Sequence, residues 1–396
     1  MSASTWQDRV HGALARVVEE GRWRAPREFD ARGAAGALEG VPDGVVSFAS
    51  NDYLGLSAHP AVVRAAHEAL ERWGAGAGAS RLVTGSRPVH RELEEALADW
   101  KGTEAAVVFP TGFAANIGVL TTLGSPGVRL LSDELNHASI VDGCRLSRAS
   151  LVVYRHGDLG HLEELLVEGA GAGTPSLVVT DTVFSMDGDV ACLEQLLALC
   201  ARHGALVVLD EAHAVLGPHL PAGFERSGAP VVRVGTLSKT LGSLGGFVAA
   251  SRDVVDLLVN RARPYIFSTA PTPADAGAAL AALRVLRAAE GAALTARLGS
   301  LVARLVDAGL APPGHPSPIV PVVLGSEERA LESSAALLER GLWVPAIRPP
   351  TVPAGTSRLR VTLSATHSDD DVQRLVDALV ELPVAPAAPA ATSALS

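Results

Sequence analysis

Two residues with reactive side chains stand where apolar runs of this sequence end. Lys239 lies in a glycine-rich loop at 236–246, and Asp210 closes the run ALVVLD, with His213 three residues later. A lysine removed from water has a lowered pKa and becomes a nucleophile or a base. A buried aspartate is costly unless it meets a positive partner. Together the two side chains predict a site in which an amine and a carboxylate face one ligand.

A third apolar run ends in a turn suited to binding an anion. Thr111, Gly112 and Phe113 directly follow the run AAVVFP and precede the helical pattern AANIGVLTTL. Free N–H groups at a helix N-terminus bind phosphate or carboxylate, although a plain helix cap is the commoner role of any one such turn. Because ligands of open α/β sheets bind beyond the carboxyl ends of the strands, the three strand ends favour one shared site.

The elements that must position this site alternate between strands and helices. Apolar runs occupy 105–110, 128–133, 151–154, 176–181, 205–210 and 231–237. Their hydrophobicity is continuous rather than alternating, which is typical of parallel strands covered on both faces. Helical patterns such as 193–203 have the length of crossover connections. The sequence therefore predicts an α/β fold with a mainly parallel central sheet and flanking helices.

The pattern changes near residue 290, where a smaller α+β domain is expected. Its predicted elements are helices at 292–308 and 327–340, strands at 318–325 and 358–364, and a last helix capped by Ser368. We divide the chain into an N-terminal helical and strand segment (1–53, with an amphipathic helix at 5–22), a large α/β domain (54–290), a C-terminal α+β domain (291–383) and a disordered Pro/Ala-rich tail (384–396).

Charge and composition argue against several classes of protein. A formal net charge of −10 disfavours a general binder of nucleic acid or anionic membranes. Three cysteines without a close pair, and no apolar stretch of about 20 residues, indicate a reduced, cytoplasmic protein. Only two of the 33 basic residues are lysines. The second, Lys101, ends a helix before Gly102, and we expect an exposed charge favoured by the helix dipole.

Other enzyme families share fragments of these motifs and are disfavoured. Residues 210–213 spell the DEAH of helicases, but Ser238 precedes Lys239 where a P-loop requires glycine. The segment GAGASR at 76–81 keeps only two of the three glycines of a dinucleotide-binding turn. No HExxH pattern or cysteine cluster is present, so no catalytic metal is expected.

Taken in order, the motifs resemble the α-oxoamine synthase family of pyridoxal 5′-phosphate (PLP) enzymes. The matching segments are NDYLGL (51–56), GAGASRLVTG (76–85), FPTGFAAN (109–116), DELNHASI (133–140), VFSMDGD (183–189), LDEAH (209–213) and TLSKTLGSLGG (236–246). The resemblance runs from about residue 5 to 382. It implies the fold of a fold type I PLP-dependent transferase, PLP as cofactor, and a homodimer with active sites at the interface.

The resemblance also implies a set of cofactor-binding residues. They are Gly112, Phe113, His137, Ser185, Asp210, His213, Thr236, Lys239, Ser268 and Thr269. Lys239 would hold PLP covalently and later act as the base, while Asp210 would pair with the ring nitrogen and His137 would stack on the ring. His213 and Ser185 would contact the side of the phenolic oxygen. The phosphate would be held by Gly112, Phe113 and Thr236, and by Ser268 and Thr269 across the dimer interface.

The substrate is implied by the segment AIRPPTVPAGTSRLRVTLSATH (346–367). It is most similar to members that join L-alanine to a pimeloyl thioester, pimeloyl-CoA or a pimeloyl carrier protein, giving 8-amino-7-oxononanoate for biotin biosynthesis. Arg348 would bind the alanine carboxylate with Thr351 in the same site, and Asn51 and Arg24 would face the acyl donor. A relative that uses glycine and another acyl-CoA, of the 2-amino-3-ketobutyrate CoA ligase type, is the alternative.

The residues that the reaction requires are present, and one neighbouring position departs from the family pattern. A catalytically inactive scaffold is disfavoured, because Lys239, Asp210, His213 and Arg348 are all present. Ala214 follows His213 where the family more usually has glycine, and nothing in the sequence indicates what this changes.

Overall fold

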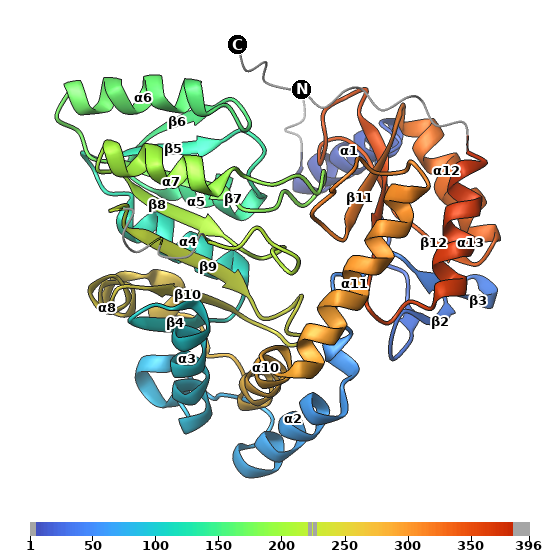
Figure 1. Cartoon of the computed structure of the whole chain (residues 1–396), viewed down its shortest axis with the longest axis horizontal. Helices are drawn as coiled ribbons and strands as arrows, with labels where there is room; N and C mark the ends of the chain where they lie inside the picture. Colours follow the sequence, from blue (N-terminus) through green and yellow to red (C-terminus); the bar gives the residue numbers. More distant parts are fainter. Residues whose placement is uncertain (1–4, 221–223, 225–227, 383–396) are drawn as a thin grey trace.

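The central element of the structure is a seven-stranded sheet with the strand order β4-β10-β9-β8-β7-β5-β6 (Figure 1). The computed structural model describes residues 5–220, 224 and 228–382, so the predicted tail at 384–396 lies outside the described residues. The strands are β4 (Ala105–Phe109), β5 (Arg129–Asp133), β6 (Ser150–Tyr154), β7 (Ser176–Asp181), β8 (Leu206–Asp210), β9 (Val231–Thr236) and β10 (Gly246–Ala250). Each of the six predicted apolar runs forms one of these strands.

The seventh strand, β10, was not expected from the sequence. It lies between β9 and β4 and pairs antiparallel with both, whereas β6, β5, β7, β8 and β9 pair parallel in that order. The segment GFVAA is short and follows a run of glycines, so it gives only a weak strand signal. The mainly parallel character of the sheet is nevertheless confirmed.

Helices cover both faces of this sheet, which explains the continuous apolar strands. On one face, Val208 packs with α4 (Gly112–Leu123), α5 (Ala138–Leu146) and α8 (Arg252–Arg261). On the other face, its neighbours Val207 and Leu209 pack with α6 (Leu159–Gly171) and α7 (Leu193–Arg202). Side chains of successive strand residues point to opposite faces. The last four residues of β8, which point to both faces, are therefore all buried.

Two smaller sheets lie on the other side of the molecule (Figure 1). One contains β1 (Phe29–Asp30), β2 (Ala35–Leu38), β3 (Val41–Ser47) and β12 (Leu342–Trp343), and the other β11 (Ile319–Gly325), β14 (Ser357–Thr362) and β13 (Ala346–Ile347). Because β3 pairs with β12, the N-terminal segment and the C-terminal residues share one sheet across the predicted boundaries. The division into domains stays a prediction.

The remaining helices pack around these sheets. They are α1 (Trp6–Glu19), η1 (Leu56–Ala58), α2 (Pro60–Trp73), the π-helical turn η2 (Arg81–Gly85), α3 (Pro88–Lys101), α9 (Arg263–Ile266), α10 (Pro273–Leu286), α11 (Ala289–Asp307), α12 (Glu327–Glu339) and α13 (Asp369–Val380). The long helix α11 runs from beside α10 towards the small sheets (Figure 1). No helix in the described ranges combines the length and apolar character that crossing a membrane requires.

Two predicted helix caps are confirmed. The Thr111 hydroxyl accepts a hydrogen bond from the Ala114 N–H at 3.0 Å and opens α4. Ser368 and Asp371 form a reciprocal capping box at the start of α13. In both helices a side-chain oxygen satisfies one of the N–H groups that the first turn leaves unpaired.

The expectation that Lys101 is an exposed charge is wrong. Its Nζ lies 2.7 Å from a carboxylate oxygen of Glu211 and 3.6 Å from the centroid of the Trp100 ring. Arg233 contacts the other oxygen of Glu211, also at 2.7 Å, and all three side chains are almost completely buried. Burial alone would raise the pKa of Glu211, but the two cations hold it below its usual value. The end of α3 docks against β8 and β9, and this contact is not visible in the helical pattern.

Glu211→Gln tests the importance of this buried cluster. The substitution leaves two buried cations without a counter-charge, and we expect it to lower the free energy of unfolding by about 3–5 kcal/mol. Denaturant-induced unfolding of both proteins measures the difference. Glu95→Gln is the matched control, because it removes an exposed ion pair with Arg91 and should cost less than about 1 kcal/mol. Equal, small losses for both variants would contradict the prediction.

Candidate active site

A cavity of about 230 Å³ lies beyond the carboxyl ends of β7, β8 and β9, at the start of α4. It brings together seven of the predicted site residues: Gly112, Phe113, His137, Asp210, His213, Thr236 and Lys239. Asn116, Ser139, Asp181 and Ser238 also line it. The three strand ends singled out in the sequence therefore meet at one place.

A chain of hydrogen bonds leads from Lys239 to the loop after β3. Lys239 Nζ lies 2.7 Å from Nε2 of His213, and Nδ1 of His213 lies 2.5 Å from the Tyr53 hydroxyl. Tyr53 in turn donates to Oδ1 of Asn51 at 3.2 Å. Burial, and then the positive charges of Lys239, Arg360 and His137, hold the pKa of His213 well below its usual value. A neutral His213 fits this chain, with Nε2 accepting from Lys239 and Nδ1–H donating to Tyr53.

The carboxylate of Asp210 is held in one orientation by two donors. Asn116 Nδ2 donates to one oxygen at 2.6 Å, and the Ala212 N–H donates to the other at 2.9 Å. Asn116 also donates to the Ser139 hydroxyl at 2.9 Å. Because it is buried and fixed, Asp210 can stabilise a positive charge at one defined point of a ligand.

Asp181 is a second buried carboxyl group next to Asp210. The two residues are register partners in β7 and β8. Burial and the negative charge of Asp210 raise the pKa of Asp181 well above its usual value, although the backbone N–H of His137 donates to Asp181 at 2.7 Å. The site therefore favours the protonated form of Asp181.

The environment of Lys239 favours a reactive amine. Burial lowers the pKa of Lys239, while the carboxylates of Asp210 and Asp181 act in the opposite direction. A lowered pKa increases the fraction of neutral, nucleophilic amine at neutral pH.

The opposite end of the cavity can hold an anion. Gly112 and Phe113 begin α4, and the Thr236 hydroxyl lies 2.7 Å from that of Ser238. A Cβ atom on Gly112 would lie 3.3 Å from Cβ of Thr236, so the glycine keeps this space open. Backbone N–H groups at a helix N-terminus and adjacent hydroxyls are donors that phosphate accepts.

These residues fit PLP by the chemistry of their donors. Lys239 offers an amine for the aldehyde, Asp210 a carboxylate for the pyridine nitrogen, and the start of α4 a cradle for the phosphate. Oδ1 of Asn116 is a buried oxygen without a hydrogen-bond partner in the described part of the chain, so the cavity retains an acceptor for a ligand.

Two predicted residues, Ser185 and Asn51, lie outside the cavity, and both accept hydrogen bonds from Arg360. The backbone carbonyl of Ser185 accepts from Nε of Arg360 at 2.5 Å, and Oδ1 of Asn51 accepts from Nη2 of the same arginine at 3.2 Å. Arg360 is thus a site residue that the sequence reasoning missed. Its signal was an arginine within the apolar run of β14, where only a buried side chain with polar partners is expected.

The other missed residues stand inside segments that were recognised. Tyr53 belongs to the segment NDYLGL and Asn116 to FPTGFAAN, but the sequence alone indicates no function for either side chain. Their roles depend on contacts with His213 and Asp210, residues distant in sequence. Asp181 ends a predicted strand, as Asp210 does, and the same strand-end argument could have identified it.

The structure does not bring the remaining predicted residues into the cavity. Arg348 donates to the Gly21 carbonyl at 2.9 Å, and the Thr351 N–H donates to the Arg348 carbonyl at 3.0 Å. Arg24 and Thr351 are exposed. Thr269 is exposed and forms an isolated bridge with Ser80, and Ser268 is half-buried beside it. The roles of these residues stay predictions.

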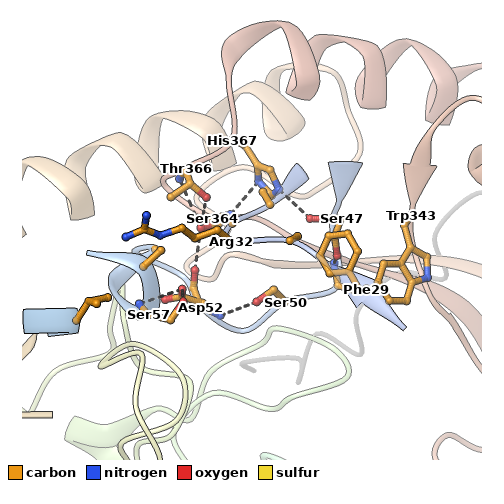
Figure 2. A pocket seen from close by; sticks show the side chains of 17 residues that line it. Phe29, Arg32, Ser47, Ser50, Asp52, Ser57, Trp343, Ser364, Thr366 and His367 are labelled. Atoms are coloured by element: carbon orange, nitrogen blue, oxygen red, sulfur yellow. Dashed lines mark hydrogen bonds between the residues drawn. The ribbon is translucent and has the colours of Figure 1, made fainter. Parts of the chain in front are cut away.

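A larger cavity of about 880 Å³ is lined by Ser50 and Asp52, the two sequence neighbours of Asn51 (Figure 2). Figure 2 shows the Asp52 carboxylate hydrogen-bonded to Ser57, and the Ser364 hydroxyl hydrogen-bonded to the Asp52 carbonyl and to Thr366. Its wall also includes Phe29 and Trp343, whose ring centroids are 5.3 Å apart. The polar groups of this cavity largely bond one another. The smaller cavity, with its amine, carboxylates and imidazoles, is therefore the candidate active site.

Comparisons with known proteins identify the family of this chain. A model of the family described as aminotransferase class I and II matches residues 43–379. The chain is 48% identical to an 8-amino-7-oxononanoate synthase of Geobacter sulfurreducens, with 94% of this chain and 97% of that protein covered. It is 53% identical to one of Anaeromyxobacter dehalogenans, with 85% of each covered.

Solved structures are similar over most of the chain. A serine palmitoyltransferase of S. paucimobilis with a PLP–myriocin adduct has a TM-score of 0.86 and 31% identity, covering 95% of this chain and 98% of that one. An 8-amino-7-oxononanoate synthase of Francisella tularensis has a TM-score of 0.71 and 26% identity, covering 85% and 97%.

The two lysines make the attachment of PLP directly testable. Borohydride reduction of the PLP-loaded protein should fix the cofactor on the peptide with Lys239 and leave the peptide with Lys101, whose amine is engaged by Glu211, unlabelled. Lys239→Ala should abolish both the label and the visible absorbance of the bound cofactor. Peptide mapping by mass spectrometry reads the result. A label on Lys101, or one that persists in Lys239→Ala, would show that Lys239 is not the attachment point.

Proposed function

The chain belongs to the 8-amino-7-oxononanoate synthases, within the class I and II aminotransferase family, and from this premise we propose that it condenses L-alanine with a pimeloyl thioester. Cα of alanine forms a bond to the thioester carbonyl carbon, the thiol leaves, and the alanine carboxylate departs as CO2. The product is 8-amino-7-oxononanoate, and the pathway is biotin biosynthesis. The observation that carries the proposal is the Lys239 amine placed among His213, Asp210 and an anion cradle.

PLP, when bound, supplies an electron sink for the negative charge that forms at Cα of the amino acid. The protein would supply the base, because Nζ of Lys239 is the amine placed to take the Cα proton of the amino acid. The lowered pKa of Lys239 suits it to this exchange of protons. Arginine in this position could neither form the covalent bond nor accept the proton at neutral pH.

Asp210 and Asn116 act on the pyridine end of the cofactor. The carboxylate of Asp210 would hold a proton on the ring nitrogen, and Asn116 fixes the direction of that carboxylate. His213 contacts the amine of Lys239, and Tyr53 contacts the other ring nitrogen of His213 and so fixes its position. Because these groups are positioned before substrate arrives, little reorganisation is needed during the reaction.

We place the alanine carboxylate at Arg360 and keep Arg348 as the second candidate. Its support is a chain of contacts: Arg360 donates to Oδ1 of Asn51, which also accepts from Tyr53, and Tyr53 contacts His213 beside the reactive amine. Arg348 instead lies 4.0 Å from the carboxylate of Glu327 and bonds the carbonyl of Gly21. A guanidinium binds a carboxylate through two parallel N–H groups, which orients the amino acid as well as holding it.

The homodimer is part of the proposal, and exposed apolar side chains support it. Leu82, Val83 and Phe267 are 54%, 73% and 68% exposed, and they lie in sequence beside the Ser80–Thr269 bridge. A second copy covering this surface would also bring Ser268 and Thr269 to the phosphate of the partner's cofactor. The cytoplasmic location expected from the sequence is likewise proposed.

Turnover with matched substrates tests the proposed reaction. We expect L-alanine with a pimeloyl thioester to give a kcat/KM at least about tenfold above that of glycine with acetyl-CoA, since one methyl group is worth about 1–3 kcal/mol of discrimination. CO2 and free thiol should form in equal amounts, with pimeloyl-CoA and a pimeloyl carrier protein compared as donors. Lys239→Ala is the inactive control. Faster turnover of glycine with acetyl-CoA would refute the proposed substrates.

The placement of the alanine carboxylate is tested by two lysine substitutions. Arg360→Lys keeps the charge but loses the planar fork, and we expect KM for L-alanine to rise about tenfold or more, since a hydrogen bond to a charged group contributes roughly 1.5–3 kcal/mol. Arg348→Lys should change this KM by less than about threefold. Steady-state kinetics at a saturating acyl donor measures both variants. The reverse order of effects would assign the carboxylate to Arg348.

A further inference from the structure

The loop between Val183 and Val190 links the large sheet to the elements of the C-terminal part. It follows β7, and its ends form an antiparallel bridge. Inside the loop, the Phe184 N–H donates to the Asp189 carbonyl at 3.0 Å, and the Gly188 N–H donates to the Phe184 carbonyl at 2.8 Å. The loop carries Ser185, whose carbonyl meets Arg360.

Residues of β14 and β11 hold this loop from one side. Arg360 Nε bonds the Ser185 carbonyl at 2.5 Å, and Arg358 forms an ion pair with the carboxylate of Asp187. A Cβ atom on Gly188 would lie 2.1 Å from the carbonyl oxygen of Ile319, so the backbones of the loop and β11 are in close contact. A shift of the loop therefore moves the acceptor that orients Arg360.

His156 holds the loop from the other side. Its Nε2 lies 2.7 Å from Asp189 of the loop, and its Nδ1 lies 2.9 Å from Asp133 at the end of β5. Its ring contacts the Phe184 ring edge-on at a centroid distance of 4.4 Å. Asp133 is itself fixed, because the Gly157 N–H donates to its second oxygen at 3.0 Å.

The two carboxylates determine the protonation of His156. An imidazole can donate from both ring nitrogens only when it is protonated. Burial would lower the pKa of His156, but hydrogen bonds and charge from Asp133 and Asp189 outweigh it and raise the pKa to about 10. His315, which faces the loop from the other side, has its Nε2 bonded to the Ile319 carbonyl at 2.7 Å. At neutral pH His156 is thus a cation between two anions.

We propose that His156 is a positioning residue for the amino acid substrate: it fixes the loop at 183–190 and thereby the place of the Arg360 guanidinium. The inference rests on the proposed function, since it concerns the carboxylate that Arg360 binds there. His156 does not line the cavity that holds Lys239, and its two hydrogen-bond partners are Asp133 and Asp189. Its effect should therefore appear in the binding of the amino acid and not in the binding of PLP.

Two substitutions at His156 separate positioning from general stability. In His156→Gln the cation is lost, and we expect the PLP-loaded enzyme to bind L-alanine about tenfold more weakly, with PLP affinity within about twofold of wild type. His156→Arg restores a cation with a planar fork that can bond both carboxylates, and alanine affinity should return to within about threefold. Calorimetric or spectral titration with L-alanine gives the affinity without an acyl donor, and kinetics gives KM and kcat separately.

Arg155→Gln is the matched control, because Arg155 precedes His156 but forms an exposed ion pair with Asp158. It should leave alanine and PLP binding unchanged. Asp189→Asn is a second test should His156→Gln fold poorly, since the Asp189 side chain is 44% exposed. It should weaken alanine binding to the same extent, and adding His156→Gln should cause little further loss.

The inference is overturned if His156→Gln and Asp189→Asn bind alanine as wild type does. It is also overturned if alanine and PLP affinity fall in the same proportion, or if His156→Arg is no better than His156→Gln. Failure of the proposed function is distinguishable: wild-type enzyme would then bind L-alanine but give no product with pimeloyl thioesters, whereas failure of the inference leaves wild-type turnover intact.

Discussion

The active site depends on placing two carboxyl groups side by side in the interior. Asp181 and Asp210 are register partners at the ends of adjacent parallel strands, and both are nearly inaccessible to solvent. Two negative charges in such a place are unfavourable, so burial and the charge of Asp210 raise the pKa of Asp181. The Asn116 amide donates to Asp210, the His137 N–H donates to Asp181, and the charge of both carboxylates favours a positive group nearby. A pyridine nitrogen that carries a proton is the further positive group that this arrangement can accommodate.

The cofactor and the amino acid are handled by different parts of the chain. Residues from the large sheet and its helices surround Lys239, whereas Arg360 comes from β14 in a separate three-stranded sheet. Asn51 and Ser185 bridge the two parts, because each offers an oxygen to Arg360. Binding of the substrate carboxylate is therefore sensitive to how the small sheets sit against the large one.

Sequence reasoning identified what local patterns encode. Continuous apolar runs indicated six strands, and polar residues at their ends indicated Lys239, Asp210 and the turn at Gly112. It missed β10, whose five residues give a weak strand signal beside glycines, and it misplaced Lys101, whose burial comes from tertiary contact with Glu211. Arg360 was missed for the same reason, since its partners Asn51 and Ser185 are far away in the sequence. The sequence therefore indicated single reactive residues, but it did not indicate contacts between residues that are distant in the chain.

The unexpected strand β10 has a consequence for how firmly the cofactor is held. Lys239 lies in the hairpin loop between β9 and β10, and Thr236, a predicted phosphate contact, stands at the base of that hairpin. A Cβ atom on Gly246, the first residue of β10, would lie 2.5 Å from the Gly112 nitrogen, so the hairpin also abuts the start of α4. The proposed attachment point of PLP and its proposed phosphate contacts therefore lie on elements of the large sheet that are in direct contact. Arg360, the proposed contact of the amino acid, belongs to a separate sheet, so the spacing of the two proposed PLP contacts does not depend on the position of the small sheets.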